Sequence, residues 1–367
     1  MELMNSSKEF SVDYYLSNKI LKQLQIQESS NIFKTGPERI FSDLKKENYD
    51  LVLIGTVHRY FNVFRKIVDN FNTSVIVHNL NFSRLSGFQL LGKVFQDDFV
   101  YRLKLLLKEG LVQSPEVYRS AKNHLVLDRF IAKKQSKKYL PLFFTKSSES
   151  HRKSIITIVI PGAVSQKRRD YKMILDELRE LRRSNLSAEQ INVKENEFRR
   201  REPSVEKIAN VDSELRRSDL SNKTIQIVFL GKAEGKELIW LKNFKKENPH
   251  IQIKYFTEKI PQYEFDQWMN RADILWCPIQ IETEFFSHKE IYGETKMTGN
   301  IGDAINYGKL AVFPTDYSTD YGFLVPQEEN IEAQLMTLQK NYTFDFKERF
   351  SKENVVEELH SVLRTLI

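Results

Sequence analysis

Residues 290–314 read Glu290-Ile-Tyr-Gly-Glu-Thr-Lys-Met-Thr-Gly-Asn-Ile-Gly-Asp-Ala-Ile-Asn-Tyr-Gly-Lys-Leu-Ala-Val-Phe-Pro314. The pattern predicts a polar, glycine-bearing loop, a short helix that Asn300 caps, and a buried strand. Asp303 follows Asn300 at the spacing of a capping box, and Gly308 is placed to end the helix.

The loop before this helix carries groups suited to an anion: Thr295, Lys296, Thr298 and Gly299. A helix N-terminus presents free backbone N–H groups and the positive end of the helix dipole, so it can hold a phosphate. The alternative is an ordinary connection between a helix and a strand of an α/β sheet. This segment alone leaves both interpretations open.

A second segment has a similar pattern. Residues 154–161 are apolar and rich in β-branched side chains, as expected of a buried parallel strand, and Gly162 follows them. Ser165 is a suitable N-cap for the helix expected next. Lys167, Arg168 and Arg169 would then lie in the first helical turn, where cations oppose the helix dipole unless an anion binds there. A solvated run of charges is the alternative.

Composition limits the classes of protein that this chain can represent. It has 367 residues, of which 41% are hydrophobic, enough for two domains with substantial cores. No apolar run is long enough to cross a bilayer, and the N-terminus lacks the basic start and apolar core of a signal peptide. The single cysteine, Cys277, excludes an internal disulfide framework. We therefore expect a cytoplasmic protein.

The net charge of +7 predicts anionic partners, such as nucleotide phosphates or an anionic membrane surface. The zinc-finger, RNP and basic-zipper patterns of nucleic-acid-binding proteins are absent, so no nucleic-acid partner is expected. Residues 101–108, Tyr-Arg-Leu-Lys-Leu-Leu-Leu-Lys, fit a peripheral contact with the inner membrane face. They also fit an amphipathic helix that packs on the first sheet, which is the favoured interpretation.

Strands and helices alternate along both halves of the chain, which predicts doubly wound parallel sheets. Helices are expected at 13–24 and 61–71. The expected strands are 50–55, 74–78 and 125–127 in the first half and 155–160, 224–230, 251–256, 274–278 and 310–314 in the second. Only residues 1–4 are available for the usual first strand, so we expect either an abbreviated strand or a chain that begins late in the domain.

These patterns predict three parts: a first domain over 1–150, a second domain over 151–345, and a C-terminal helix over 346–367 that can cross back to the first domain. The second domain contains a charged insert at 180–222, crowded with Arg, Glu, Lys and Ser. It is expected to be helical, either as a solvated protrusion or as a partner-binding arm.

Four blocks resemble the glycosyltransferases with the GT-B fold, close to the large retaining family 4 (group 1) and its capsule and exopolysaccharide members. Residues 158–167 resemble the strand, glycine loop and Ser-x-Lys element that opens the family's nucleotide-sugar domain. Residues 260–278, with Ala272-Asp273, and residues 290–314 resemble its later donor-site elements. Val77-His78-Asn79 in the first half is similar to the family's strand-end histidine motif.

The chain departs from the family at its acidic pair. The family commonly has two glutamates separated by seven residues, the second five residues before the glycine. Here the second position holds Asp303 and the first holds Thr295. The departure leaves the fold expectation in place and puts the roles of the acids in doubt.

The resemblance implies an α/β fold with two Rossmann-like domains facing a central cleft, and a site with three groups of residues. The residues implied for catalysis are His78, Lys167 and Lys296. Those implied for the donor diphosphate are Gly162, Ser165, Arg168, Thr295, Thr298 and Gly299. Those implied for the ribose or sugar are Asp303, Glu290 and Asn79. Cations and helix N–H groups would stabilise the charge on the leaving phosphate, so no metal and no cofactor are expected.

The implied activity is transfer of a sugar from a UDP- or GDP-sugar to a glycan, lipid-linked or protein-linked acceptor. The resemblance points to a retaining, metal-independent enzyme of bacterial surface polysaccharide or glycoconjugate synthesis. Two alternatives remain open: a catalytically silent GT-B protein that supports a partner transferase, and a sugar-nucleotide epimerase.

Overall fold

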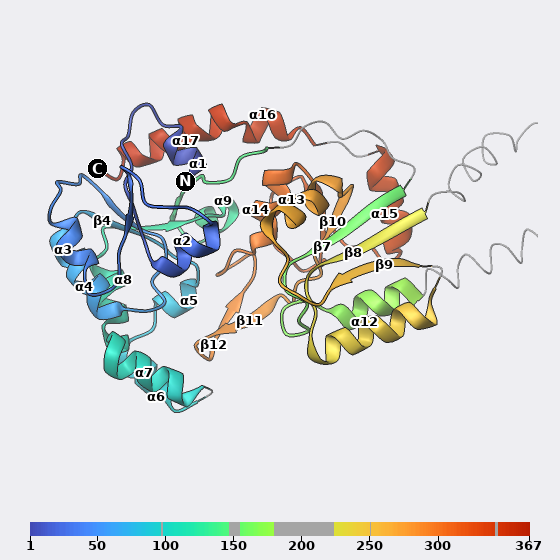
Figure 1. Cartoon of the computed structure of the whole chain (residues 1–367), viewed down its shortest axis with the longest axis horizontal. Helices are drawn as coiled ribbons and strands as arrows, with labels where there is room; N and C mark the ends of the chain where they lie inside the picture. The colour runs from blue at the N-terminus through green and yellow to red at the C-terminus, as the bar shows by residue number, and fades with distance from the viewer. Residues whose placement is uncertain (97, 147–154, 180–223, 250, 342–343) are drawn as a thin grey trace, which may run out of the picture.

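The computed structural model describes residues 1–96, 98–146, 155–179, 224–249, 251–341 and 344–367. Its two domains each contain a parallel β-sheet (Figure 1). The sheet of the first domain has the order β3-β4-β5-β6, and that of the second has the order β14-β13-β10-β7-β8-β9. Every pairing within these two sheets is parallel. The predicted α/β class with two parallel sheets is confirmed. The second sheet reverses its strand order next to β7 and is doubly wound, whereas the strands of the first sheet follow one another in chain order.

The predicted strands correspond to strands of these sheets. The first domain contains β3 (Val52–Ile54), β4 (Thr73–Ile76), β5 (Asn123–Val126) and β6 (Lys138–Tyr139). The second contains β7 (Ile155–Pro161), β8 (Thr224–Lys232), β9 (Gln252–Phe256), β10 (Ile274–Trp276), β13 (Leu310–Phe313) and β14 (Leu324–Pro326). The edge strands β6 and β14 were not predicted, because two or three residues are too few to show a strand period.

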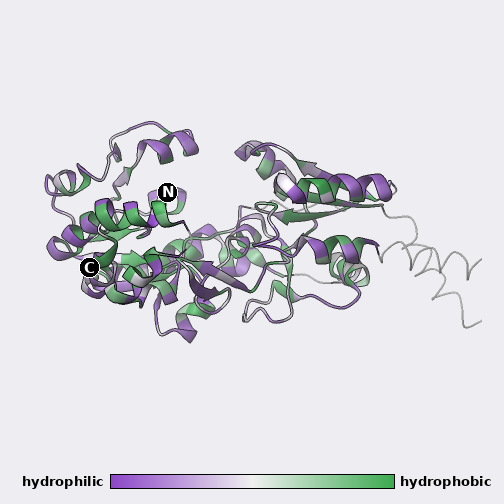
Figure 2. Ribbon diagram, turned by 90° about the horizontal axis from the view of Figure 1, so that it is seen from below, coloured by the Kyte–Doolittle hydropathy of each residue, from purple (hydrophilic) through white to green (hydrophobic). Residues whose placement is uncertain are grey.

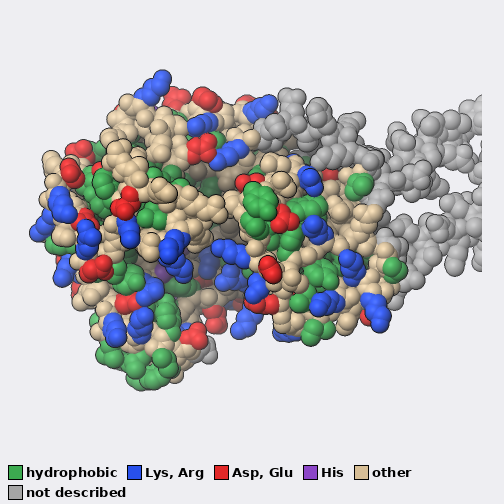
Figure 3. Space-filling model, in the orientation of Figure 1, with side chains coloured by type: hydrophobic (Ala, Val, Ile, Leu, Met, Phe, Trp, Pro, Cys, Tyr) green, Lys and Arg blue, Asp and Glu red, His purple; other side chains and the backbone are tan. Residues whose placement is uncertain are grey.

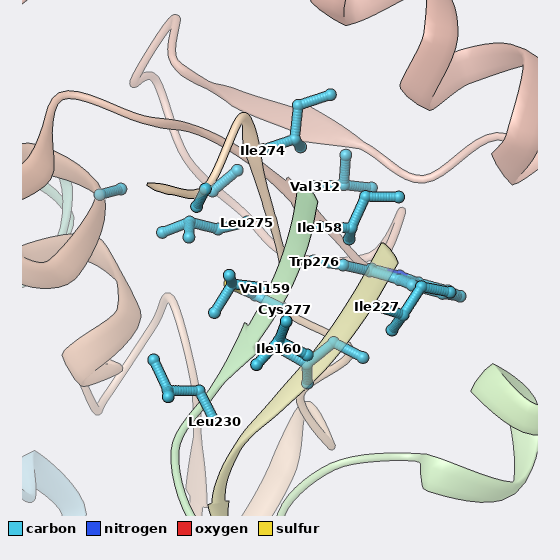
Figure 4. Packing of buried hydrophobic residues seen from close by; sticks show 14 of the residues in the cluster. Ile158, Val159, Ile160, Ile227, Leu230, Ile274, Leu275, Trp276, Cys277 and Val312 are labelled. Carbon is cyan, nitrogen blue, oxygen red and sulfur yellow. The ribbon is translucent and has the colours of Figure 1, made fainter. Parts of the chain in front are cut away.

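The apolar runs explain the six-stranded sheet. Side chains of Ile158, Val159 and Ile160 on β7 pack among those of β8, β10 and β13 (Figure 4). Helices cover both faces of this sheet, so its central strands are apolar throughout and do not alternate. Colouring by hydropathy shows apolar residues on the inner strands and polar residues on the outer faces of the helices (Figure 2).

The helices that connect the strands are mostly of ordinary length. Those of the first domain are α3 (Ile40–Leu44), α4 (Phe61–Asn70), α5 (Leu80–Ser83), α6 (Gly87–Val94), α7 (Phe99–Glu109), η1 (Leu111–Gln113), α8 (Ser114–Ser120) and α9 (Arg129–Lys134). Those of the second are a helix over residues 171–179, α12 (Gly235–Glu247), α13 (Gln262–Arg271), α14 (Gly299–Tyr307) and α15 (Ile331–Asn341).

The N-terminal prediction was partly wrong. The segment considered for a short first strand forms helix α1 (Glu2–Asn5). The helix expected at 13–24 is divided into β1 (Tyr14–Leu16) and α2 (Asn18–Leu24), because Ser17 accepts a hydrogen bond from Ile20 N–H and starts the helix there. Strand β1 pairs with β2 (Ile32–Lys34) in a separate two-stranded sheet.

The C-terminal segment contains α16 (Phe346–Phe350) and α17 (Lys352–Arg364). Helix α17 contributes Leu359 and Leu363 to a cluster with Ile76 of β4 and Leu125 of β5. The last helix therefore packs on the sheet of the first domain. The charged insert expected at 180–222 lies outside the described residues.

A β-hairpin links the domains and was not predicted from the sequence. Its strands are β11 (Glu282–Phe285) and β12 (His288–Ile291), which pair antiparallel. The two turn residues, Phe286 and Ser287, have positive φ values of 55° and 49°. The hairpin leaves the second domain after β10 and reaches the first domain (Figure 1). Turns of this kind favour Asn and Gly, so Phe-Ser provided no turn signal.

Candidate functional site between the two domains

A cavity of about 190 Å³ lies where the two domains meet. Its first-domain side is formed by residues that follow or end β4 and β5, and its second-domain side by the loop before α14. The carboxyl ends of parallel strands are the usual ligand-binding edge of an α/β sheet. The lining residues are Val77, His78, Leu80, Val126, Leu127, Ile131, Phe143, Thr295, Met297, Thr298 and Gly299.

The N-terminus of α14 opens into this cavity. Thr298 caps the helix, its Oγ1 accepting a hydrogen bond from Asn300 N–H at 3.4 Å, so the prediction of Asn300 as the cap was wrong by two residues. A side chain at Gly299 would meet no atom within 4 Å, which shows open space at the first helical position. Gly308 ends the helix in the left-handed conformation, as predicted.

Asn300 connects α14 to the end of β7. Its Nδ2 donates to Pro161 O and to Asp303 Oδ2, both at 3.3 Å, and its Oδ1 accepts from Arg169 Nη2 at 3.0 Å. The capping-box spacing of Asn300 and Asp303 therefore corresponds to a real contact between side chains. Its role is to hold the helix N-terminus against the glycine loop.

The guanidinium of Arg169 packs against Gly162, in the glycine loop that follows β7. A Cβ on Gly162, which has φ +106°, would lie 2.3 Å from Arg169 Nη2, so only glycine leaves room for the guanidinium. Arg169 also lowers the pKa of the Asp303 carboxyl, although burial outweighs it. The sequence predicts Lys167 and Arg168 for the site and does not single out Arg169, because the three basic residues cannot be told apart until the turn is known.

The helix predicted to start at Ser165 starts at residue 171. Ser165 instead opens a turn, since its carbonyl accepts from the N–H groups of Arg168 and Arg169, both at 3.0 Å. Asp170 takes the capping role by accepting from Met173 N–H at 3.1 Å. Lys167 and Arg168 are exposed on this turn and not in a helical turn. Their conflict with the helix dipole, expected from the sequence, therefore does not arise.

Lys296 lies at the border of the two domains. Its Nζ is 5.6 Å from the Tyr292 ring centre and 5.9 Å from that of Phe285, a residue of the hairpin. Burial lowers the pKa of the ammonium, and nearby Arg168 lowers it further, while Glu290 opposes both. The described residues place no carboxylate within 4 Å of this cation. Lys296 therefore has charge to offer an anionic ligand.

Glu290 and Thr295 are engaged in structure. The Glu290 carboxylate is fully buried and accepts from Phe82 N–H at 2.8 Å and Asn81 N–H at 3.3 Å. Thr295 O accepts from Leu80 N–H at 3.0 Å. Together they cap helix α5 of the first domain. The structure thus places Glu290, expected from the resemblance to bind a sugar, away from open space, because its oxygens satisfy this helix end.

His78 lies beside the cavity with one ring nitrogen engaged. Its Nε2 is 2.8 Å from Gly55 O, and since a carbonyl can only accept, this nitrogen carries the proton. Its orientation is therefore set by the loop that follows β3. Gly55 itself faces open space, where an added Cβ would meet nothing within 4 Å.

A second histidine, His58, was missed by the sequence analysis. It follows β3 and packs on Phe285, with ring centres 4.5 Å apart, and lies 5.9 Å from the His78 ring. Burial lowers the pKa of His58 to about 4, with the charges of His78 and Lys296 contributing, so the ring is neutral at pH 7. One signal could have identified His58: it follows the expected strand 50–55, which ends in glycine. The same edge of the sheet carries His78 at the end of the next strand.

Asn79 supports His58 and has no direct opening to the cavity. It is buried, and its Nδ2 lies 3.0 Å from His58 Nε2, to which it donates when that nitrogen is unprotonated. Its Oδ1 has no partner among the described residues. Asn79 therefore contacts His58, the neighbour of His78, and neither Asn79 nor His58 lines the cavity.

Asp303 lies on α14, where Asn300 donates to its carboxylate, and it is not among the residues that line the cavity. Burial raises the pKa of its carboxyl to about 6, while the hydrogen bond from Asn300 and the charge of Arg169 oppose the shift. The group is therefore mainly ionised at pH 7 and protonates readily below it. A carboxylate in this state can accept hydrogen bonds from hydroxyl groups.

A second cavity of about 460 Å³ lies in the second domain. Its lining includes the carboxylates of Asp170, Glu282 and Asp316, so it is unsuited to a diphosphate. Among the described residues, no group of three or more His, Cys, Asp or Glu side chains is placed to hold a metal ion. Within the same part of the chain, no helix has the length and apolarity needed to cross a membrane.

No family model matches the sequence, and no curated protein matches it. The N-terminal domain of trehalose-6-phosphate phosphatase from Candida albicans matches with a TM-score of 0.53 and 8% identity, over 99% of this chain and 91% of that chain. A UDP-forming α,α-trehalose-phosphate synthase from Burkholderia xenovorans matches with a TM-score of 0.40 and 8% identity, over 90% and 74%. A UDP-GlcNAc 2-epimerase from Methanocaldococcus jannaschii has a TM-score of 0.37 and 12% identity, over 95% and 88%.

The first similarity extends over nearly the whole chain, and at 8% identity it concerns the fold alone. Together with the two parallel sheets, it supports the fold expected from the sequence: two Rossmann-like domains in the GT-B arrangement, with a cavity between them.

Proposed function

We propose that this protein is a glycosyltransferase that takes a sugar from a UDP- or GDP-sugar and transfers it to a glycan, lipid-linked or protein-linked acceptor. The proposal includes a retaining reaction without a metal ion, in bacterial surface polysaccharide or glycoconjugate synthesis. It rests on the site described above and on the resemblance of residues 158–167 and 290–314 to family 4.

One observation carries the proposal: the N-terminus of α14 opens into the interdomain cavity, and two cations of the second domain lie beside that helix end. Arg169 donates to Asn300 in the first turn of α14, and Lys296 lies in the loop two residues before the cap Thr298. Cleavage of a sugar nucleotide leaves negative charge on the diphosphate, which such donors stabilise. Helix N–H groups and two cations could supply this stabilisation within the chain.

The remaining residues suit recognition of the donor. Asp303 would accept hydrogen bonds from ribose hydroxyls, since it is mainly ionised at pH 7. His78, oriented by Gly55 O, would contact the transferred sugar from the first domain. Its proton-bearing nitrogen is engaged with that carbonyl, so we assign it to orientation of the sugar and not to proton transfer.

Calorimetric titration with UDP, GDP and their sugar conjugates tests nucleotide binding. Lys296→Ala should weaken the binding of the preferred nucleotide by about 1.5–3 kcal/mol, the range for a charge-assisted hydrogen bond. Lys242→Ala, which removes an exposed lysine on α12, is the matched control and should bind like the wild type. Equal affinity in all three proteins would remove Lys296 from the site.

Product analysis separates the proposed enzyme from its alternatives. A glycosyltransferase releases a nucleoside diphosphate and free sugar slowly when only donor and water are present. Binding without release would favour a silent GT-B protein, and conversion of the donor into an isomeric sugar would favour an epimerase. Failure to bind either nucleotide would contradict all three.

A further inference from the structure

The helix pair α6 and α7 exposes an unusual number of large apolar side chains. Phe88 is 85% exposed and Phe95 is 75% exposed, both on or next to α6. Val100 and Leu107 of α7 are 81% and 73% exposed. Leu91, Phe99 and Tyr101 are also exposed. These seven residues, which we call the apolar tip, form a cluster at the projecting end of the first domain (Figures 1 and 3).

The spacing of these residues shows that the exposure is organised. On α6, Leu90 and Val94 are buried, while Phe88, Leu91 and Phe95 are exposed on the adjoining side of the helix at helical spacing. An ordinary surface helix buries its apolar side and exposes its polar side. The apolar side of α6 is wider than the part that is buried, so its exposed part is suited to another apolar environment.

Helix α7 combines apolar and basic residues on its outer side. Arg102, Leu105 and Glu109 are buried, while Val100, Lys104, Leu107 and Lys108 are exposed. Figure 3 shows Lys and Arg side chains beside the apolar cluster. Lysines can extend their ammonium groups to lipid phosphates while apolar neighbours enter the boundary between headgroups and acyl chains.

The inner side of the helix pair is firmly held. Arg102 Nη2 donates to Ser287 Oγ at 2.7 Å, and Lys93 Nζ donates to Ser287 O at 2.7 Å. Arg102 also lies 4.6 Å from the Phe286 ring centre. These contacts join α6 and α7 to the hairpin. Because the side of the helix pair that faces the hairpin is fixed in this way, the apolar tip on the other side points into solvent.

We infer that the apolar tip is a membrane-docking surface for a bilayer that contains anionic lipids. A convex, projecting cluster fits a deformable lipid surface, and its lysines complement anionic headgroups. Docking through the tip would hold the hairpin side of the protein near the membrane, where a lipid-linked acceptor would be found. The inference concerns attachment and stands independently of the proposed donor reaction.

The test measures partition of the full-length protein onto vesicles of phosphatidylcholine with and without phosphatidylglycerol. We expect binding to the anionic vesicles that weakens as salt rises. Phe88→Ser/Phe95→Ser should lower the partition coefficient at least tenfold, and Lys104→Glu/Lys108→Glu should lower it severalfold. Ile239→Ser/Tyr263→Ser, which removes two exposed apolar residues of the second domain, is the matched control and should bind like the wild type.

A spectroscopic measurement shows which part of the molecule enters the lipid. Phe95→Trp places a fourth tryptophan in the tip, since Trp240, Trp268 and Trp276 all lie in the second domain. After subtraction of the wild-type spectrum, its emission should shift to shorter wavelength on anionic vesicles. Nucleotide affinity measured without vesicles should stay unchanged in every tip variant, which separates this test from that of the donor site.

Two results would overturn the inference. One is equal partition of the wild type and the Phe88→Ser/Phe95→Ser variant. The other is absence of wild-type binding to the anionic vesicles. If light scattering then shows a dimer that the same variant abolishes, the tip is a contact between copies of the chain.

Discussion

The aromatic residues of the hairpin and those of the apolar tip belong to neighbouring surfaces with opposite environments. Phe285 packs on Phe82 and His58 of the first domain, with ring centres 4.8 Å and 4.5 Å apart. Phe88 and Phe95, in contrast, face outward. The residue type is the same in both places. What differs is whether a segment from the other domain covers it.

The covered phenylalanines of the hairpin are part of the contact that joins the two domains. The hairpin supplies apolar contact through Phe285 and Phe286, and a buried carboxylate at Glu290 that caps α5. An apolar group covered in this way contributes stability in proportion to the area removed from water. The apolar tip has no such cover within the described residues, so its side chains should be free to vary without loss of fold.

The largest effect is expected at Glu290. Glu290→Ala would leave the N–H groups of Asn81 and Phe82 without their acceptor inside the interface, which should lower the free energy of unfolding by about 2–4 kcal/mol. Denaturant titration measures this. Glu282→Ala on the same hairpin removes an exposed residue paired with Lys289 and should cost less than about 1 kcal/mol. Equal losses would show that the buried cap is unimportant.

The phenylalanines test the comparison directly. Phe285→Ala should cost about 1–3 kcal/mol, less than for a fully buried phenylalanine because the ring is half-buried. Phe88→Ala, at the apolar tip, should change the free energy of unfolding by less than about 0.5 kcal/mol. A large loss at Phe88 would mean that the tip is packed in solution, and would break the contrast.

The pKa of His58 measures how well Phe285 shields the ring from water. Its pKa is lowered to about 4 by burial, so Phe285→Ala should raise it toward the ordinary value of about 6.5. NMR titration of the ring measures this directly, and Phe88→Ala is the control that should leave the pKa unchanged.

The lowered pKa of His58 also predicts a pH effect on stability. As pH falls from about 6.5 to 4, the unfolded chain binds a proton at this residue before the folded chain does, so the folded state loses stability. The free energy of unfolding of the wild type should therefore fall relative to that of His58→Gln over this window. A constant difference would contradict the assignment of a neutral, buried ring.

The smallest expected effect concerns Asp303, which lies outside both aromatic groups. Burial raises the pKa of its carboxyl to about 6, so the folded state gains relative stability as pH falls toward 4, the opposite sign to His58. If the carboxylate binds ribose, affinity for the nucleoside part should rise severalfold between pH 5 and 7. Titration with uridine or guanosine avoids protonation of the phosphates, and Asp303→Asn should remove the dependence.

Much of the second domain was predictable because its signals are local. The apolar run of β7, the run of β13 and the glycine at 308 each show their structure within a few residues. The loop before α14 was also identified in advance. Three of its residues, Thr295, Thr298 and Gly299, line the cavity.

The inward position of Arg169 and the presence of His58 were not predictable in this way. Arg169 differs from Lys167 and Arg168 only through a turn that Ser165 and Asp170 form. His58 lies next to His78, which lines the cavity, and it is buried there because the hairpin brings Phe285 onto it. The positions of Arg169 and His58 therefore leave no mark in the hydrophobic pattern or composition of their own segments.

Local backbone preference and apolar periodicity act over a few residues, and these gave the strands, the helices and the two-sheet class. The site depends on contacts such as Glu290 with Phe82, 208 positions apart in the chain. The free energy of such a contact depends on how two surfaces fit and on which polar groups are left without partners. The hydrophobic periodicity of either segment gives no information on these two properties. The same reason explains why Phe285 became covered and Phe95 did not.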